Sequence, residues 1–182
     1  RMETATQNGI KRAVIVGGGL IGIEMAEMFH SRQIPVTFLV RESSFWNAVL
    51  PVEESEMINN HILAHGIDLK LGEELIEIKG ENGKVKSVIC KNSDDQIPCD
   101  FVGLTVGVSP NIDILKESEI RTNRGIVVDA YLQTSIQDIY AIGDCAELSH
   151  PDVGRKSIEA VWYTGRMMGK TVAQTICDKP TK

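Results

Sequence analysis

The sequence has no excess of positive charge, few aromatic residues and no long apolar run. Its 182 residues include 19 Lys and Arg against 25 Asp and Glu, a formal net charge of -6. This balance argues against a nucleic-acid surface, because such a surface needs clustered cations to neutralise phosphates. No run approaches the ~18 apolar residues of a membrane span, and the first residues lack the pattern of a signal peptide. We therefore expect a cytoplasmic protein that binds neither membranes nor nucleic acid.

Metal-ligand spacing and closely spaced cysteine pairs are also missing. The four cysteines are spread along the chain without a C-x-x-C pattern: Cys90, Cys99, Cys145 and Cys177. We expect them to be buried or half-buried thiols rather than a zinc site or a redox dithiol. None of the four histidines has a partner placed for acid–base work. The sequence therefore predicts no metal site and identifies no catalytic residue.

What the sequence does have is an alternation of apolar runs, glycine turns and helical periodicity, with 42% hydrophobic residues and 16 glycines. The apolar run 13–16 stops at three glycines, the helical pattern 20–29 follows, and a second strand at 35–40 closes a unit of the ~30 residues typical of a βαβ crossover.

We predict a helix over 53–65, with Met57, Ile58, Ile62 and Leu63 facing inward, and a strand over 67–71. Two further strands, 75–78 and 85–89, flank an Asn-Gly turn, and 101–106 is a buried strand. The pattern predicts an α/β fold, a Rossmann-like three-layer β/β/α domain with a β-meander.

The pattern changes after about residue 111. We expect isolated strands over 125–129 and 138–144 without crossover helices of their own, and then a long helix over 158–176. Trp162, near the start of that helix, is expected to pack in the core. This helix needs a sheet to pack on, and the chain offers few strands for it.

A glycine-rich turn follows the first strand and opens the first helix. It satisfies G-x-G-x-x-G over Gly17, Gly18, Gly19, Leu20, Ile21 and Gly22. In this context Gly17 permits a tight turn, Gly19 lets a pyrophosphate approach the backbone, and Gly22 lets the helix lie close to the strand. The free N–H groups and positive dipole at the start of the helix suit an anion. The turn therefore predicts dinucleotide binding.

The end of the second strand is where such a fold selects its cofactor, since a carboxylate there binds the adenine ribose of NAD. That position carries Val40, and the next residue, Arg41, is a cation suited to the 2′-phosphate of NADP. Glu42 could replace the missing carboxylate and favour NAD instead. The cation at this position therefore favours NADP slightly, and NAD remains the alternative.

Three segments together resemble one family. Residues 16–27, Val-Gly-Gly-Gly-Leu-Ile-Gly-Ile-Glu-Met-Ala-Glu, are similar to the NAD(P)-binding turn of the pyridine nucleotide-disulfide oxidoreductases. Residues 102–111 resemble the segment where that family's chain leaves the NAD domain, and residues 134–144 match its second FAD motif, T-x-x-x-x-I-Y-A-x-G-D. Within the superfamily the resemblance is to the branch of NADH oxidases, the nitrite reductase large subunit, and rubredoxin or ferredoxin reductases.

The resemblance implies roles for individual residues. Gly143 and Asp144 would bind FAD, with Asp144 accepting a hydrogen bond from a ribityl hydroxyl. Glu24 would lie near the nicotinamide and the flavin, and Gly107 where the carboxamide meets the backbone. The helix that contains Trp162 and Tyr163 would pass the flavin. The intact enzyme would move hydride from NAD(P)H to the flavin and then deliver electrons to an unidentified acceptor, a small substrate or a redox protein.

The sequence also departs from the family pattern. Residues 1–111 read as an NAD(P)-binding Rossmann domain and 112–182 as the C-terminal part of an FAD-binding domain, without its N-terminal half or a C-terminal interface domain. We therefore expect a fragment that is inactive alone, from an enzyme that could be a homodimer. A thioredoxin-reductase-like enzyme is disfavoured because its nucleotide domain should hold a C-x-x-C. The alternative is a stand-alone NAD(P)-binding sensor without catalysis.

Overall fold

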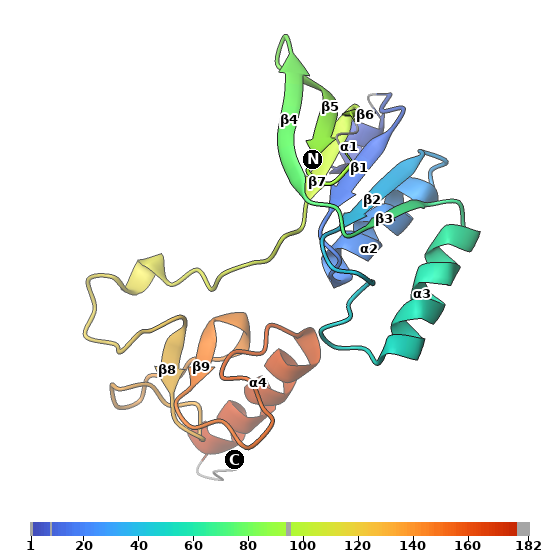
Figure 1. Ribbon diagram of the computed structural model, residues 1–182. Coiled ribbons are helices and arrows are strands. Elements are labelled where there is room, and N and C mark those ends of the chain that lie inside the picture. The colour runs from blue at the N-terminus through green and yellow to red at the C-terminus, as the bar shows by residue number, and fades with distance from the viewer. Residues whose placement is uncertain (1, 8, 94–95, 178–182) are drawn as a thin grey trace. The chain divides into compact units, whose positions relative to one another are not determined.

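The computed structural model describes residues 2–7, 9–93 and 96–177. The chain divides into two compact units, residues 1–108 and 109–182 (Figure 1). This division falls close to the boundary expected after residue 111. None of the helices within the described residues is long and apolar enough to cross a bilayer.

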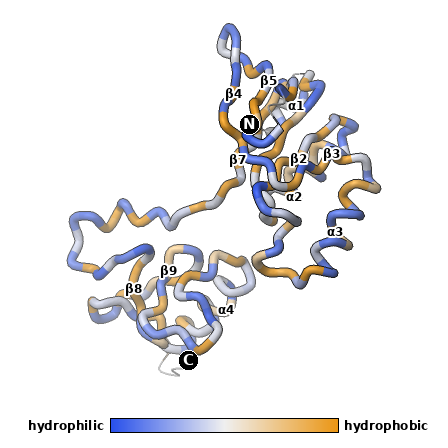
Figure 2. The backbone as a smooth tube through the Cα atoms, viewed as in Figure 1, coloured by the Kyte–Doolittle hydropathy of each residue, from blue (hydrophilic) through white to orange (hydrophobic). Residues whose placement is uncertain are grey.

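The first unit is built on a parallel sheet whose strands lie in the order β3-β2-β1-β7. Their bounds are β1 Ala13–Val16, β2 Val36–Val40, β3 Asp68–Leu71 and β7 Phe101–Leu104. Helix α2, Leu20–His30, connects β1 to β2. The strands are predominantly hydrophobic (Figure 2), and β1 and β2 are buried at every position. Near-continuous apolar runs are typical of parallel strands that are covered on both faces.

Two different layers cover this sheet. On one face Ile15 and Phe38 pack with Phe29 of α2 and Ile62 of helix α3, Val52–Ala64. On the other face the alternate residues of β1 and β2 pack against an antiparallel meander, β4 Leu75–Glu81, β5 Lys84–Cys90 and β6 Gln96–Pro98. The three-layer β/β/α arrangement predicted from the sequence is confirmed. A short helix, α1, Met2–Gln7, is joined to the turn that follows α2 by the Arg32–Glu3 ion pair at 2.8 Å.

Helix α3 differs from its prediction in which side chains face inward. Met57 and Leu63, expected on the inner side, are 63% and 51% exposed. Ile62 is buried as predicted and Ile58 packs against the core, but the other buried positions are the polar residues Ser55 and Asn59. The reason is a set of hydrogen bonds from Ser55 and Asn59 to the loop that precedes α3, which compensates the burial of polar groups.

The second unit contains a parallel pair of short strands, β8 Ile126–Val128 and β9 Ala146–Leu148, and helix α4, Trp162–Ile176. Two turns of 3-10 helix, η1 Asp113–Leu115 and η2 Gly143–Cys145, precede β8 and β9 respectively. Its core joins both strands to Met168 and Val172 of α4. The strand expected over 125–129 is present as β8, within its predicted bounds.

Three expectations for this unit are wrong. Residues 138–144 do not form a strand, because the left-handed backbone at Asp138 (φ 63°) and Gly143 (φ 76°) interrupts it. Helix α4 begins at Trp162 rather than at residue 158, because Ser157 accepts a hydrogen bond from Leu148 at 2.8 Å and holds the preceding segment beside β9. Trp162 is 66% exposed instead of packing in the core.

The cysteines follow their prediction with one exception. Cys90 and Cys99 are buried between the sheet layers, and Cys145 is half-buried. Burial raises the pKa of the Cys99 thiol to about 11. Cys177 is exposed, since it caps the C-terminal end of α4.

Candidate nucleotide-binding site

The turn between β1 and α2 leaves peptide N–H groups available at the start of a helix. Gly17 has a φ of 117°, and its N–H donates to the Leu39 carbonyl at 2.9 Å, which ties the turn to β2. Gly19 is the N-cap residue of α2, and no side chain of the described residues caps it. The first turn of α2 therefore presents unpaired donors and a positive dipole end, the arrangement that binds phosphate groups.

The glycines of the turn are required for two different reasons. A Cβ on Gly17 would lie 2.5 Å from the Thr105 carbonyl oxygen, and one on Gly22 would collide with the carbonyl oxygen of Gly17. A Cβ on Gly18 would lie 2.7 Å from Val40 Cγ1. Beside Gly19, by contrast, no protein atom lies within 4 Å of such a Cβ. Gly17, Gly18 and Gly22 thus allow neighbouring parts of the protein to pack closely against the turn. Gly19, by contrast, leaves open space beside the turn.

Thr105, the residue after β7, fixes the turn and was not identified from the sequence. Its N–H and its Oγ1 both donate to the Val16 carbonyl at 2.8 Å, and Oγ1 also lies 3.2 Å from the Gly17 carbonyl oxygen. These contacts hold the C-terminal ends of β1 and β7 together below the glycines. The signal available in the sequence was only a polar residue at the end of an apolar strand.

A cavity of about 580 Å³ lies along the carboxyl edge of the parallel sheet. The loops that follow β3, β2, β1 and β7 line it, in the order of those strands in the sheet. The lining residues are Val16 to Gly19, Leu39, Arg41, Glu42, Trp46 to Ala48, Glu73 to Leu75 and Leu104 to Gly107. Nucleotides bind in the crevice outside the carboxyl ends of the strands in open α/β sheets, and this volume is typical of a ligand pocket.

The predicted site residues divide into those that line the cavity and those that support it. Gly17, Gly18, Gly19, Arg41 and Gly107 line it. The other residues predicted to bind NAD(P) are not among the lining residues. Gly22 and Val40 are buried beneath the turn. Leu20, Ile21 and Glu24 are exposed on α2.

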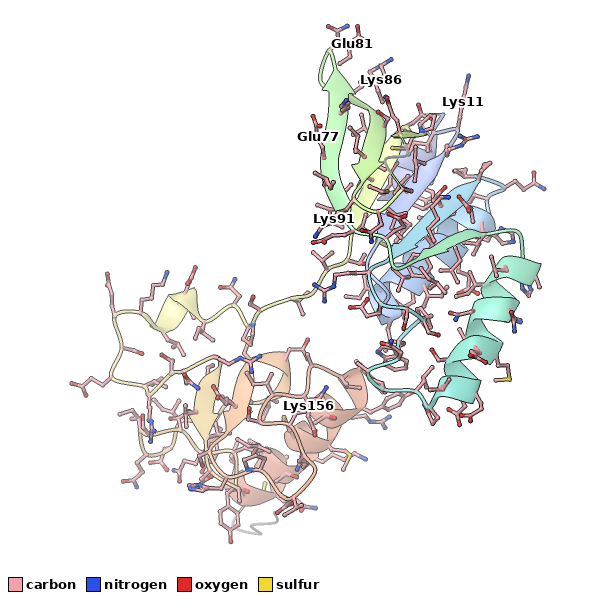
Figure 3. All side chains as sticks on the ribbon, viewed as in Figure 1. Lys11, Glu77, Glu81, Lys86, Lys91 and Lys156 are labelled. Atoms are coloured by element: carbon pink, nitrogen blue, oxygen red, sulfur yellow. The ribbon has the colours of Figure 1, made fainter. Side chains whose placement is uncertain are left out.

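Charged side chains gather where β2 and β3 end. Arg41 lies 3.1 Å from a carboxylate oxygen of Glu42, and its side chain is 74% exposed. Glu73 and Glu74 enter the cavity wall from the loop after β3. Lys91, labelled in Figure 3, lies 3.0 Å from a carboxylate oxygen of Glu74. Carboxylates therefore outnumber cations in this part of the cavity wall.

The second unit contains the two residues expected to bind FAD. Gly143 has a left-handed backbone, and its N–H lies 3.3 Å from Met168 Sδ of α4. Asp144 is exposed beside it. A Cβ on Gly165 of α4 would lie 3.4 Å from the Gly143 Cα, so the helix approaches η2 closely through two glycines.

A buried carboxylate stabilises the neighbouring turn. Glu147 on β9 accepts hydrogen bonds from the Gly125 N–H at 2.8 Å and from Asn123 Nδ2 at 2.9 Å. Burial alone would raise the pKa of Glu147, but these hydrogen bonds outweigh it and hold the pKa below its usual value. Among the described residues no group of three His, Cys, Asp or Glu side chains could hold a metal ion.

The fold and the glycine turn are typical of a dinucleotide-binding α/β domain, and comparison with known proteins identifies the family. Residues 1–174 match the model of the pyridine nucleotide-disulphide oxidoreductase family. The chain belongs to this family, as its motifs predicted. Proteins of the family use FAD and NAD(P)H.

Individual relatives support the same placement. The nitric oxide reductase FlRd-NAD(+) reductase of Salmonella heidelberg is 35% identical over 139 residues, which cover 76% of this chain and 36% of the relative. A ferredoxin reductase from Rhodopseudomonas palustris has a TM-score of 0.85 at 28% identity, over 96% of this chain and 42% of that one. A NAD-dependent persulfide reductase from A. fulgidus has a TM-score of 0.87 at 25% identity, over 96% and 32%. The chain thus spans about a third of the length of the curated relatives it matches.

Proposed function

We propose that the first unit binds a reduced nicotinamide dinucleotide along the carboxyl edge of its parallel sheet. The observation that carries the proposal is the open space beside Gly19, in a turn whose other glycines are packed against the protein. A pyrophosphate that approaches Gly19 meets the free N–H groups at the start of α2. The adenosine half then lies on the β2 and β3 side of the cavity, and the nicotinamide half on the β7 side.

The cofactor we propose is NADH rather than NADPH. The guanidinium of Arg41 already pairs with Glu42, and Glu73 and Glu74 add negative charge to the same side of the cavity. A 2′-phosphate on the adenine ribose would enter this negative region, whereas free ribose hydroxyls can donate to the carboxylates. The Salmonella relative is named as a FlRd-NAD(+) reductase, and the NAD(+) in that name agrees with this preference.

On the nicotinamide side we assign the carboxamide to the backbone near Gly107, whose φ of 116° turns the chain at the cavity wall. Glu24 is the proposed carboxylate near the nicotinamide, and it is exposed on α2. In the second unit, Gly143 and Asp144 are the proposed FAD residues. The exposed Asp144 carboxylate can accept hydrogen bonds from flavin hydroxyls, and Gly143 adds no side chain to block that approach.

In a protein of the length of these relatives, the two units would serve hydride transfer from NADH to FAD, followed by electron delivery to an acceptor. The flavin supplies the redox chemistry when it is bound. The role of this chain is to hold and orient the two cofactors, which makes the hydride transfer between them effectively intramolecular. A small redox protein is the proposed acceptor, since the relatives include a putidaredoxin reductase solved in complex with putidaredoxin and the flavorubredoxin-type reductase of Salmonella.

Calorimetric titration of the purified chain with NADH, NADPH and FAD in parallel tests the proposal. We expect NADH to bind more tightly than NADPH, and FAD to bind weakly or not at all. Failure of both nicotinamide cofactors to bind at about millimolar concentration would reject the dinucleotide site. Tight FAD binding in place of NADH would mean that the glycine turn serves the other nucleotide.

A further inference from the structure

The loop between β2 and α3 can be followed in Figure 1. It places a tryptophan in the cavity wall. Trp46 is half-buried, and its backbone has a φ of 52°. A left-handed backbone is uncommon for a bulky residue and persists only where the surroundings hold it. The indole packs against the buried Phe45, with ring centroids 6.5 Å apart.

Two buried polar side chains of α3 hold this loop. Asn59 Oδ1 accepts from the Phe45 N–H at 3.0 Å, while Asn59 Nδ2 donates to Ser44 Oγ at 2.7 Å. Ser55 Oγ donates to the Phe45 carbonyl at 2.5 Å. Both peptide groups of Phe45 are thus bound by side chains that are almost completely buried. Apolar residues at 55 and 59 would leave the N–H and the carbonyl of Phe45 without these side-chain partners.

The order of the strands decides which half of a dinucleotide Trp46 can meet. The loops after β2 and β3 are joined by backbone hydrogen bonds, from Gly72 to Glu42 at 2.9 Å and from Glu73 to Val40 at 3.1 Å. They lie on one side of the glycine turn, and the loop after β7 lies on the other. The ribose next to the adenine binds at the end of the second strand in this fold. Trp46 therefore belongs to the adenosine side.

We infer that Trp46 is the side chain on which the adenine ring stacks, and that Ser55 and Asn59 are positioning residues that hold the loop in the conformation this requires. The inference rests on the proposed function, and it names the part of the cofactor that the site recognises. An indole offers an adenine a large flat surface, and such stacking accounts for much of the affinity in other sites that bind bases.

Tryptophan fluorescence tests this directly, because the chain has two tryptophans, Trp46 and Trp162. In a Trp162→Phe background all tryptophan emission comes from Trp46. We expect ADP-ribose, which carries the adenine but no nicotinamide, to quench this emission saturably. In the matched control, Trp46→Phe, the emission comes from Trp162 of the second unit and should not respond.

The affinities provide an independent readout. We expect Trp46→Ala to weaken ADP-ribose binding about 5- to 150-fold in calorimetry, the range expected for the loss of one stacked base, and Trp46→Phe to weaken it less. Asn59→Ala should also weaken ADP-ribose binding at a temperature where the variant is folded. If Asn59 had only a structural role, its loss would lower Tm and leave the affinity of the folded protein unchanged.

The outcomes separate the two proposals. If ADP-ribose binds without quenching Trp46, and Trp46→Ala binds it as tightly as the unchanged chain, the stacking inference is wrong and the dinucleotide site stands. If neither NADH nor ADP-ribose binds, the proposed function itself fails.

Discussion

Replacing Gly19 with alanine should leave the fold intact and damage cofactor binding. The new Cβ meets no protein atom within 4 Å, and the backbone at Gly19 is extended, with φ −102° and ψ −178°. Alanine is a poorer N-cap residue than glycine, but it also restricts the unfolded chain by about 0.4–1 kcal/mol. Because these effects oppose each other, we expect Tm to change by only a few degrees.

The cost to binding follows from the same geometry. The methyl group would occupy the space through which the pyrophosphate approaches the turn. Inserting one methyl group into a well-packed contact typically costs about 1–3 kcal/mol, which corresponds to an NADH affinity about 5- to 150-fold lower. Calorimetric titration with NADH and thermal unfolding of the same samples measure the two effects separately.

Gly169→Ala is the matched control. Gly169 lies within α4, and a Cβ there would be 3.8 Å from Ile142 Cδ1, an ordinary contact. This variant should bind NADH like the unchanged chain. An unchanged NADH affinity in Gly19→Ala would refute the reasoning, since the pyrophosphate could then not lie against Gly19.

Three further predictions concern the turn, the cofactor preference and acid stability. Gly22→Ala should lower the free energy of unfolding by about 1–3 kcal/mol in urea denaturation, because the new Cβ would meet the Gly17 carbonyl oxygen and lie 3.0 Å from Phe38 Cε2. A free energy of unfolding equal to that of the unchanged chain would contradict the role of Gly22 in packing α2 against the turn. Glu42→Gln should remove the negative charge that pairs with the guanidinium of Arg41 and so narrow the preference for NADH over NADPH, measured as the ratio of the two Kd values. An unchanged ratio would show that the Arg41–Glu42 pair does not affect the choice of cofactor. The lowered pKa of Glu147 means that its stabilising contribution is present above its unfolded value of about 4.5 and is lost as the pH falls below it. Glu147→Gln should therefore reduce stability at neutral pH and make the second unit less sensitive to acid, as judged by urea midpoints at about pH 7 and about pH 3.

The layers of the first unit could be predicted because its sequence pattern is local and regular. The run 13–16 is apolar at every position, the glycines stop it, and the helical period of 20–29 follows at once. The structure has β1 and α2 at these places, with the meander on the opposite face. In the second unit the sequence signal was weaker, and residues 138–144 were misassigned because the apolar pattern does not reveal the left-handed backbone at Asp138 and Gly143 that interrupts the strand.

The residues that the sequence did not reveal act through tertiary contacts. Ser55 and Asn59 look like solvated helix residues, and only the loop that binds to them explains their burial. Thr105 matters because β7 lies beside β1, a pairing between segments almost ninety residues apart. Trp46 lines the cavity because that loop is held against α3, and no periodic pattern marks such a position.

The most direct test of the central claim is a titration of the isotopically labelled chain with NADH, followed residue by residue through the backbone amide signals in NMR spectra. A dinucleotide on the glycine turn predicts that the amide signals of Gly18, Gly19 and Gly107 shift with a common dissociation constant. Shifts confined to the second unit, around Gly143, or no saturable shift at all, would contradict the account.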